Sequence, residues 1–189
     1  MPDGFPRLRD LLTDATQLAA FVQRHPDPAL VIDKVAAEGG GGVDTPSGPF
    51  PQGVSSSTEI LGPLAAAQQL TRMGELVNPE AQVAFLSKSE RNPFGGLVTL
   101  GRARNNDLVL GVSSVSKLHA IFTHPDERWL LEDDDSANGT FLNGSRLPAK
   151  QKTRVNDGDS LRFGPDVQCR LYVPASLYAL LGLLRGAGR

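Results

Sequence analysis

The sequence has little cysteine, no excess of basic residues and no long apolar run, and each shortage excludes a class of protein. Cys169 is the only cysteine, so the chain can form neither an internal disulfide nor a metal site built from several cysteines. Lysine and arginine number 19 against 21 aspartate and glutamate residues, which is not the basic footprint of nonspecific nucleic-acid binding. No apolar run approaches the length of a bilayer span. We therefore expect no nucleic-acid partner and no membrane partner.

The N-terminal residues carry charges throughout and lack the apolar core of a secretory signal peptide. A cytoplasmic protein is the resulting expectation. Cys169 lies in a predicted strand over residues 169–173, where we expect a small buried side chain.

Apolar residues recur at helical spacing near both ends of the chain. Residues 6–25 are predicted to be a helix that starts at Pro6 and ends at His25-Pro26. Its apolar face would consist of Leu8, Leu11, Leu12, Ala15, Leu18, Ala19 and Val22. A C-terminal helix after Pro174 would present Leu177, Leu180, Leu181 and Leu184. Either face could pack on the chain's own β domain, or it could dock a partner helix or a second copy. A helix-mediated partner or self-association therefore stays open.

Between the N-terminal helix and the strands lies a segment rich in glycine, proline and serine. Residues 38–57 cannot bury enough apolar surface to offset their chain entropy, so they are predicted to be a flexible linker. Residues 29–37 could add a short helix or strand before this linker. Residues 58–79 read as a second helical piece, which Asn78-Pro79 ends.

Residues 101–164 contain short runs of Leu, Val, Ile, Phe and Trp, separated by Gly, Asn, Asp and Ser. Such runs are typical of β-strands joined by tight turns. Asn143-Gly144 is a hairpin signal, because both positions tolerate a positive φ. Strands are also predicted over residues 82–86, 97–100 and 160–163. This spacing favours a sandwich or barrel whose loops gather at its ends.

Several turn motifs in residues 83–173 occur in the order and spacing of the forkhead-associated (FHA) domain, and the chain resembles that family, in particular its bacterial-type single-FHA adaptors. The motifs are Gly101-Arg102, Asn106-Asp107, Ser116-Lys117-Leu118-His119, Ser136-Ala137-Asn138-Gly139-Thr140, Asn143-Gly144, Gly158-Asp159 and Phe163-Gly164. The resemblance implies an all-β, antiparallel sandwich of about 11 short strands, with N-terminal and C-terminal helical flanks. It also implies a module that binds phosphothreonine peptides in its loops and has no catalytic activity.

The expected organisation follows from these patterns. It comprises an N-terminal helical segment (1–37), the linker (38–57), a helical segment (58–79), the FHA-like sandwich (80–173) and a C-terminal helix (174–189). The expected function is a phosphothreonine-binding adaptor in Ser/Thr-kinase signalling. Its expected partners are a phosphorylated protein and a Ser/Thr protein kinase or its substrate. No cofactor and no metal are expected.

The candidate phosphopeptide-binding residues are Arg102, Ser116, Lys117 and Asn138. A phosphate needs a cation and several hydrogen-bond donors, and the planar guanidinium of Arg102 matches phosphate oxygens in a bidentate way. Ser116 offers a hydroxyl donor and Lys117 a second positive charge. The resemblance implies that Asn138 holds the peptide backbone. The competing interpretation of Arg102 is a surface arginine paired with Asp107 or another carboxylate.

Four further residues are expected to support the loops: Gly101, His119, Gly139 and Asn143. Ser116 with His119 could suggest a nucleophile and base, and His119 with His124 a metal site. Neither set is complete, because no orienting carboxylate and no further ligand is evident. The resemblance implies that His119 binds neighbouring backbone.

Two features raise the question of another function, and the second of them favours one. Residues 158–161 spell the GDSL motif of serine hydrolases, but no histidine follows Ser160. Ala137 stands where FHA domains commonly have Thr or Ser, whose hydroxyl adds a contact to the phosphate. This departure favours the alternative function, a phosphate-independent structural or protein-interaction domain.

Overall fold

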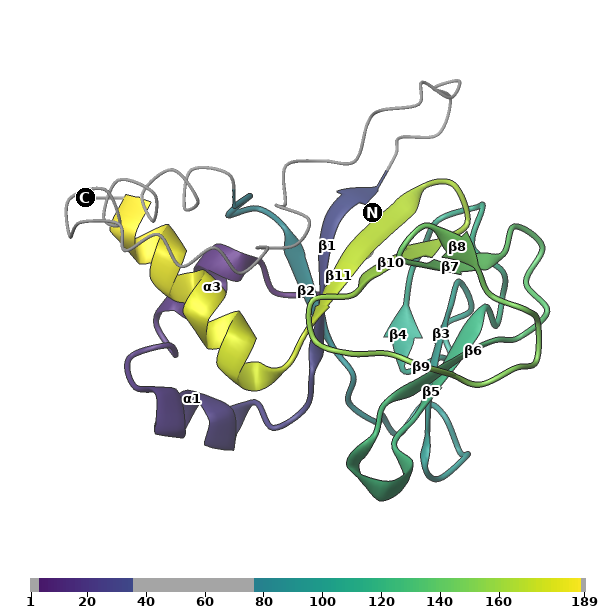
Figure 1. The fold of residues 1–189 in the computed structure, drawn as a ribbon, viewed down its shortest axis with the longest axis horizontal. Coiled ribbons are helices and arrows are strands. Elements are labelled where there is room, and N and C mark those ends of the chain that lie inside the picture. Colours follow the sequence, from purple (N-terminus) through teal and green to yellow (C-terminus); the bar gives the residue numbers. More distant parts are fainter. Residues whose placement is uncertain (1–3, 36–76, 188–189) are drawn as a thin grey trace, which may run out of the picture.

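The computed structural model describes residues 4–35 and 77–187 of the chain, and within them eleven strands form two sheets (Figure 1). The larger sheet contains β2 (Gln82–Phe85), β1 (Ala29–Val35), β11 (Val167–Tyr172), β10 (Ser160–Phe163), β7 (Thr140–Leu142) and β8 (Ser145–Arg146), in that spatial order. The smaller sheet contains β4 (Leu108–Val109), β3 (Leu97–Gly101), β5 (Ala120–Thr123), β6 (Leu130–Asp133) and β9 (Thr153–Arg154). The neighbouring strands are antiparallel except for β3 and β4. The expected all-β sandwich is confirmed.

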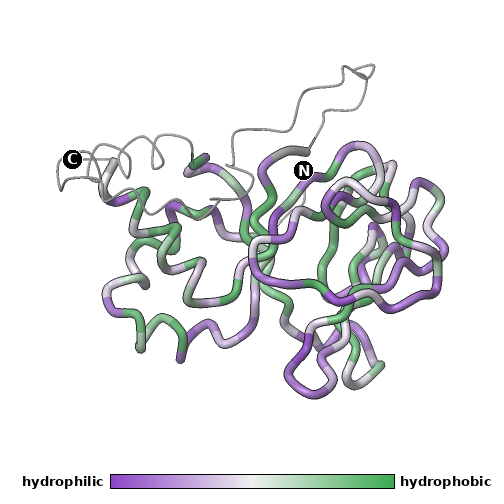
Figure 2. The backbone as a smooth tube through the Cα atoms, in the orientation of Figure 1, coloured by the Kyte–Doolittle hydropathy of each residue, from purple (hydrophilic) through white to green (hydrophobic). Residues whose placement is uncertain are grey.

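The core of the sandwich lies between the two sheets. Along β10 the side chains alternate, so Leu161 and Phe163 are fully buried while their neighbours are partly exposed. Phe163 meets Phe122 of the smaller sheet edge-on, with ring centroids 6.5 Å apart. Hydrophobic stretches coincide largely with the strands, whereas many connecting loops are hydrophilic (Figure 2). The loops are therefore free to carry polar, functional residues.

A second core joins the larger sheet to the helices at its β2 and β1 end (Figure 1). The helical elements are η1 (Leu8–Leu12), α1 (Leu18–Arg24) and α3 (Pro174–Ala187), and a short turn, η2 (Pro125–Glu127), lies in the sandwich. Ala29, Val31 and Val83 of the sheet are buried in the same cluster as Leu8, Phe21 and Leu177 of the helical elements. The apolar helical faces thus pack on the chain's own β domain.

The helix predicted over residues 6–25 is wrong in its continuity. Residues 8–12 form a 3₁₀ helix, and a separate short α-helix follows at 18–24. Leu18 and Ala19, placed on the predicted apolar face, are exposed, whereas Phe21 is buried in the helical cluster, with its ring centroid 5.7 Å from that of Tyr178 in α3. The helical spacing of apolar residues reports only local sequence. The packing of Phe21 in the helical cluster determines which residues of α1 are buried.

Within the segment 1–37, which was expected to be helical, Ala29–Val35 is a strand, one of the two alternatives left open for residues 29–37. β1 lies between β2 and β11, with Ala29 opposite both Phe85 and Tyr172. Its side chains are buried on both faces: Leu30 and Ile32 point into the sandwich core, and Val31 into the helical cluster. The sandwich therefore includes a strand that precedes the predicted linker. Residues 38–57 and nearly all of 58–79 lie outside the described part of the chain.

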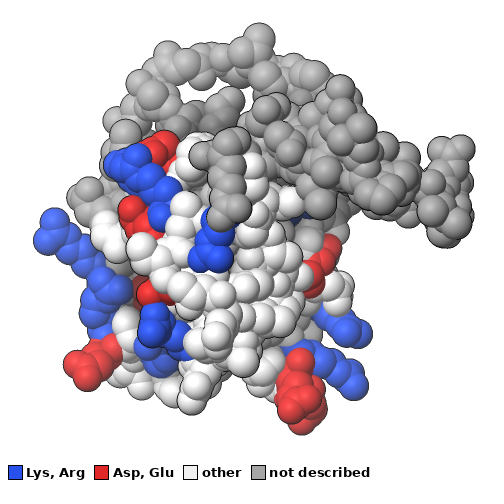
Figure 3. Space-filling view, turned by 90° about the vertical axis from the view of Figure 1, so that its left-hand side faces the viewer, with Lys and Arg blue, Asp and Glu red and all other residues white. Residues whose placement is uncertain are grey.

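On the side of the molecule that carries the helices, the surface charge is neither predominantly positive nor predominantly negative. Blue and red side chains are interspersed there around an uncharged area (Figure 3). Near the helices Glu80 pairs with both Arg7 and Arg9, and Arg24 pairs with Asp14. None of the helices described in the structure is long and apolar enough to cross a bilayer.

Candidate functional site

The candidate residues come from three loops at one end of the sandwich. Arg102 follows β3, Ser116 and Lys117 precede β5, and Asn138 lies between β6 and β7. Backbone hydrogen bonds join the first two loops: Arg102 N donates to Ser116 O over 2.9 Å, and Ala103 N to Lys117 O over 3.0 Å. These hydrogen bonds hold the backbone segments that carry the Arg102 guanidinium and the Ser116 hydroxyl side by side.

Gly101 is required where these two loops meet. A Cβ at this position would lie 2.3 Å from the carbonyl oxygen of Lys117, far inside van der Waals contact. The Asn106 amide closes the same junction, since its Nδ2 donates to Lys117 O over 2.7 Å and to Ala103 O over 2.8 Å. Any side chain at Gly101 would push apart the two loops that carry Arg102 and Ser116.

The third loop is attached through side chains. The backbone N–H of Ala137 donates to Ser116 Oγ over 3.0 Å, and Asn138 Nδ2 donates to Ser114 O over 2.7 Å. Ser116 thus uses an acceptor lone pair within the protein, and its own O–H stays able to donate outward. Among the described residues, Asn138 Oδ1 accepts no hydrogen bond, so it can accept one from a peptide N–H.

His119 lies beneath the loops and is fully buried. Its Nδ1 accepts from Ser116 N over 3.1 Å, which places the ring proton on Nε2, 3.3 Å from Gly139 O. Burial lowers the pKa of His119 below its ordinary value, although the bond to Gly139 and the charge of Asp133 oppose this shift. A neutral histidine therefore ties two binding loops together.

Both ring nitrogens of His119 face backbone groups. His119 therefore forms neither the nucleophile–base pair with Ser116 nor the metal site with His124 that the sequence suggests. Ser116 Oγ accepts from Ala137 and is not the partner of the ring. His124 instead stacks on Trp129 with ring centroids 4.6 Å apart. In residues 4–35 and 77–187 no three His, Cys, Asp or Glu side chains gather as a metal site would require.

Asp133 holds the third loop, and the sequence analysis missed it. Its Oδ1 accepts from Ser136 N over 3.0 Å, and its Oδ2 accepts from Ser136 Oγ and Thr140 Oγ1, each over 2.6 Å. Burial would raise the pKa of this carboxyl, but the hydrogen bonds from Ser136 and Thr140 outweigh it and lower the pKa. Ser136 Oγ in turn accepts from Gly139 N over 3.0 Å. Asp133 is followed by two further aspartates, and nothing in the sequence distinguishes the carboxylate that points inward.

Arg102 is exposed, and within the described residues its side chain forms no ion pair with a carboxylate. In the described part of the chain, this side chain makes one hydrogen bond, from Nε to Val115 O over 3.2 Å. The alternative pairing with Asp107 is not formed, because Asp107 is buried and accepts from Ser89, Asn92 and Thr99. The terminal nitrogens of Arg102 are thus available to an external anion.

This arrangement of loops coincides with a family match. A family model described as the FHA domain matches residues 98–164. These residues are an FHA domain.

The wider relatives of this FHA domain are larger proteins. The chain is 29% identical over 163 residues to the ABC transporter ATP-binding/permease protein Rv1747 of Mycobacterium tuberculosis, covering 85% of this chain and 18% of that protein. It is 28% identical over 95 residues to the FHA domain-containing protein At4g14490 of Arabidopsis thaliana, covering 47% of this chain and 25% of that protein. The chain therefore spans a quarter or less of these two relatives. A similar solved structure is the N-terminal FHA domain of Rad53p from S. cerevisiae in complex with a phosphothreonine peptide, at 24% identity and a TM-score of 0.43, covering 51% of this chain and 88% of that chain.

Asn143 supports a different part of the FHA domain from the other three supporting residues. It lies in the β7–β8 turn with a φ of 50°, directly after β7, whereas Gly139 lies directly before that strand. Its Nδ2 donates to Asp159 Oδ1 over 2.8 Å, and its Oδ1 accepts from Ser160 N over 2.9 Å. Residues 158–161, which match the GDSL motif, thus form the end of a turn and the start of β10.

Proposed function

We propose that this chain binds phosphothreonine peptides through its FHA domain and acts as a cytoplasmic adaptor in Ser/Thr-kinase signalling. The observation that carries the proposal is the convergence of three kinds of group at one end of the sandwich. Arg102 offers an unpaired guanidinium, Ser116 a free hydroxyl proton and Asn138 a free carbonyl oxygen. Together they match a phosphate followed by a peptide backbone.

Each group has a separate task in this proposal. Arg102 binds two phosphate oxygens through its planar fork, and Ser116 donates its hydroxyl proton to a third oxygen. Lys117, which is exposed and forms no ion pair in the part of the chain that the structure describes, adds a positive charge that attracts the dianion. Asn138 accepts from a backbone N–H of the peptide and so fixes its direction. The supporting bonds of Gly101, His119 and Asp133 hold these donors in place before the ligand arrives.

The second candidate function is phosphate-independent binding by the same domain, and Ala137 favours it. Its methyl group cannot donate to a phosphate, and its backbone N–H is already used by Ser116. Such a domain would bind its partner without regard to phosphorylation. The two functions differ in one measurable property, the ratio of affinities for a phosphorylated peptide and its unphosphorylated copy.

The test is a degenerate phosphothreonine peptide library, followed by calorimetry on the selected peptide and its unphosphorylated copy. Arg102→Ala should lose about 2 to 4 kcal/mol of binding free energy, because a charge-assisted pair is removed. Arg102→Lys should recover only part of this loss, since a point charge cannot reproduce the fork. Arg104→Ala is the matched control, because Arg104 is an exposed arginine in the same loop.

Equal affinity for the two peptides would establish the phosphate-independent function instead. Unchanged affinity of a folded Arg102→Ala variant for the phosphopeptide would refute the assignment of the phosphate site.

A further inference from the structure

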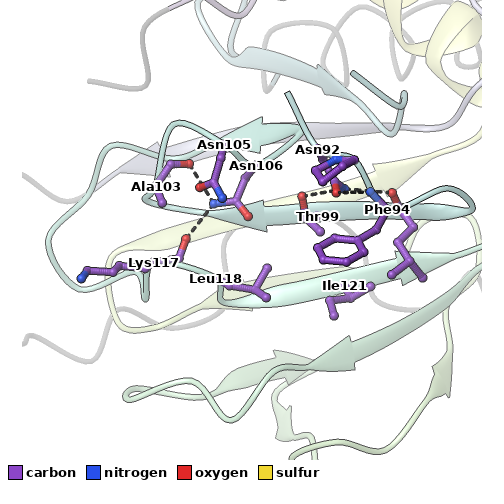
Figure 4. Close-up of a pocket in the computed structure, with 11 residues that line it drawn as sticks. Asn92, Phe94, Thr99, Ala103, Asn105, Asn106, Lys117, Leu118 and Ile121 are labelled. Carbon is purple, nitrogen blue, oxygen red and sulfur yellow. Dashed lines mark hydrogen bonds between the residues drawn. The ribbon is translucent and has the colours of Figure 1, made fainter. Parts of the chain in front are cut away.

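Two hollows open beside β3 and β5 of the smaller sheet. One is a groove between Phe94 and Ile121 that reaches Lys117 and so adjoins the candidate phosphate loops (Figure 4). The other, which we call the far pocket, has a volume of about 280 Å³ and lies at the opposite ends of the two strands, where β3 begins and β5 ends. The residues that line it include Asp27, Leu86, Lys88, Leu97, His124 and Trp129.

The far pocket is separate from the candidate phosphate site. Arg102 directly follows the last residue of β3, whereas the pocket is lined by the first residue of that strand, Leu97. The length of β3, about five residues, spans about 16 Å. Asp27 comes from the loop between α1 and β1 and precedes the FHA domain in the chain. A ligand in the far pocket therefore does not compete with one at Arg102.

Apolar and aromatic side chains make up much of the far pocket. Leu86 and Phe122 belong to the buried core, and Leu97 is half-buried. Trp129 is half-buried as well, and its ring stacks on His124 with an interplanar angle of 20°. Pockets that hold small molecules have volumes of about 300 to 1,000 Å³. The far pocket is slightly smaller than these, which suits a single side chain better than a cofactor.

The carboxylate of Asp27 is the free charge of the far pocket. Its Oδ2 accepts from Ser87 Oγ over 2.7 Å, and Asp27 forms no ion pair within residues 4–35 and 77–187. An aspartate that is half-buried beside aromatic rings and has no cationic partner favours a positively charged ligand.

Lys88, the other charged residue that lines the far pocket, does not neutralise Asp27. Its Nζ donates to Asp107 Oδ1 over 3.1 Å, to Ser89 O over 3.3 Å and to Asn92 O. An ammonium group has three protons, so these three acceptors use all of them. Lys88 therefore offers the pocket only its apolar stem, and an anionic ligand would find no free donor on it.

We propose that the far pocket binds the side chain of an arginine on an exposed segment of a partner protein. The apolar stem of the arginine packs on Leu86 and Leu97, and its planar guanidinium pairs with Asp27 and lies against the aromatic surface of Trp129. The indole N–H of Trp129 has no acceptor in the part of the chain that the structure describes, so it can donate to a backbone carbonyl next to the arginine. That donor favours an arginine within a peptide over a free guanidinium compound.

This site goes beyond the proposed function and does not depend on it. A protein that presents an arginine to the far pocket and a phosphorylated protein at Arg102 could be bound at the same time, one at each end of the sandwich.

Fluorescence provides the test, because Trp129 is the only tryptophan of the chain and its emission therefore reports on the far pocket. The probe is an acetylated and amidated pentapeptide with arginine at its centre and glycine and alanine around it, titrated into the full chain. The reference is the same peptide with citrulline, which has nearly the shape of arginine but no charge. The arginine peptide should bind at least about tenfold more tightly, since only a cation can pair with Asp27 and interact with the face of Trp129.

Asp27→Asn keeps the shape of the side chain and removes its charge. It should reduce the arginine-over-citrulline ratio to below about threefold. Asp126→Asn is the matched control, because it removes the same charge from an exposed aspartate that does not line the far pocket, and it should keep the full ratio. Arg102→Ala should also keep the full ratio, whatever it does to phosphopeptide binding, because Arg102 lies at the other end of β3.

Three outcomes would overturn the proposal. Equal binding of the arginine and citrulline peptides to the unaltered protein would refute it without reference to any variant. Equal losses in Asp27→Asn and Asp126→Asn would show that arginine is attracted by the general charge of this end of the domain and not by the pocket. Agmatine, a guanidinium compound without a peptide backbone, binding as tightly as the arginine peptide would refute the assignment to a partner protein.

Discussion

Replacing His119 with alanine tests whether a buried neutral imidazole holds the loops together. The change leaves two buried backbone groups, Ser116 N–H and Gly139 C=O, without their partners. Each unpaired group costs about 1 to 3 kcal/mol, and the space vacated by the fully buried ring adds a cavity term. We therefore expect the free energy of unfolding to fall by about 3 to 6 kcal/mol. Chemical denaturation followed by circular dichroism measures this change directly.

Because the tautomer of His119 assigns an acceptor to Nδ1 and a donor to Nε2, two further substitutions can test the two hydrogen bonds separately. An asparagine at position 119 offers an acceptor where Nδ1 accepts from Ser116, and a glutamine offers a donor where Nε2 donates to Gly139. Each variant can restore one of the two bonds, so both should be more stable than His119→Ala and less stable than the wild type. A His119→Ala protein within about 0.5 kcal/mol of the wild type would refute the role of His119 as a tie between the loops.

The pH dependence has a defined sign. Burial lowers the pKa of His119 in the folded state, so below the ordinary value of 6.5 the unfolded chain takes up a proton more readily than the folded one. The contribution of His119 to stability is therefore complete above that pH and declines as the pH falls. The stability gap between the wild type and His119→Gln should be largest at pH 7.5 and smaller at pH 5.

Two further variants test other parts of the structure. Ala137→Thr should strengthen phosphothreonine binding by up to about tenfold, because it adds a hydroxyl beside Ser116; a folded variant without any gain, measured by calorimetry, would show that this loop does not approach the phosphate. Burial raises the pKa of Asp33 in β1 to about 6, with Arg170 opposing the shift, so ionisation of Asp33 costs stability as the pH rises from about 4 to 6. Asp33→Asn should accordingly raise the free energy of unfolding by up to about 3 kcal/mol at pH 7.5 and have little effect at pH 4. Equal effects at the two pH values in thermal melts would contradict that origin.

The features that the sequence predicted well are those determined by local chemistry. Ser160–Phe163 was predicted with its observed bounds, because its alternation and the turn before it lie within a few residues of each other. Gly101 is among the residues expected to support the loops, and the carbonyl oxygen of Lys117 lies where a Cβ at this position would be.

The features that could not be predicted from the sequence depend on residues that are distant in the chain. The sequence leaves residues 29–37 open between a helix and a strand, and pairing with β2 and β11, which are distant in sequence, decides for the strand β1. Asp107 and Asp133 look like surface carboxylates until the folded chain brings donors such as Asn92 and Thr140 to them. The groove escaped for the same reason, since Phe94 and Ile121 come from separate segments that meet only in the folded sheet.

The place of β1 in the larger sheet has a consequence for synthesis on the ribosome. Ala29 pairs with Tyr172, so the strand emerges about 140 residues before its second neighbour exists. At about 5 to 20 residues per second, translation keeps it waiting for roughly 7 to 30 s. During that interval a strand meant to be buried on both faces has apolar side chains in water and one open edge, which is the state that chaperones bind and that aggregates. The larger sheet therefore cannot be completed until β11 has been made, and β1 is without its second partner until then.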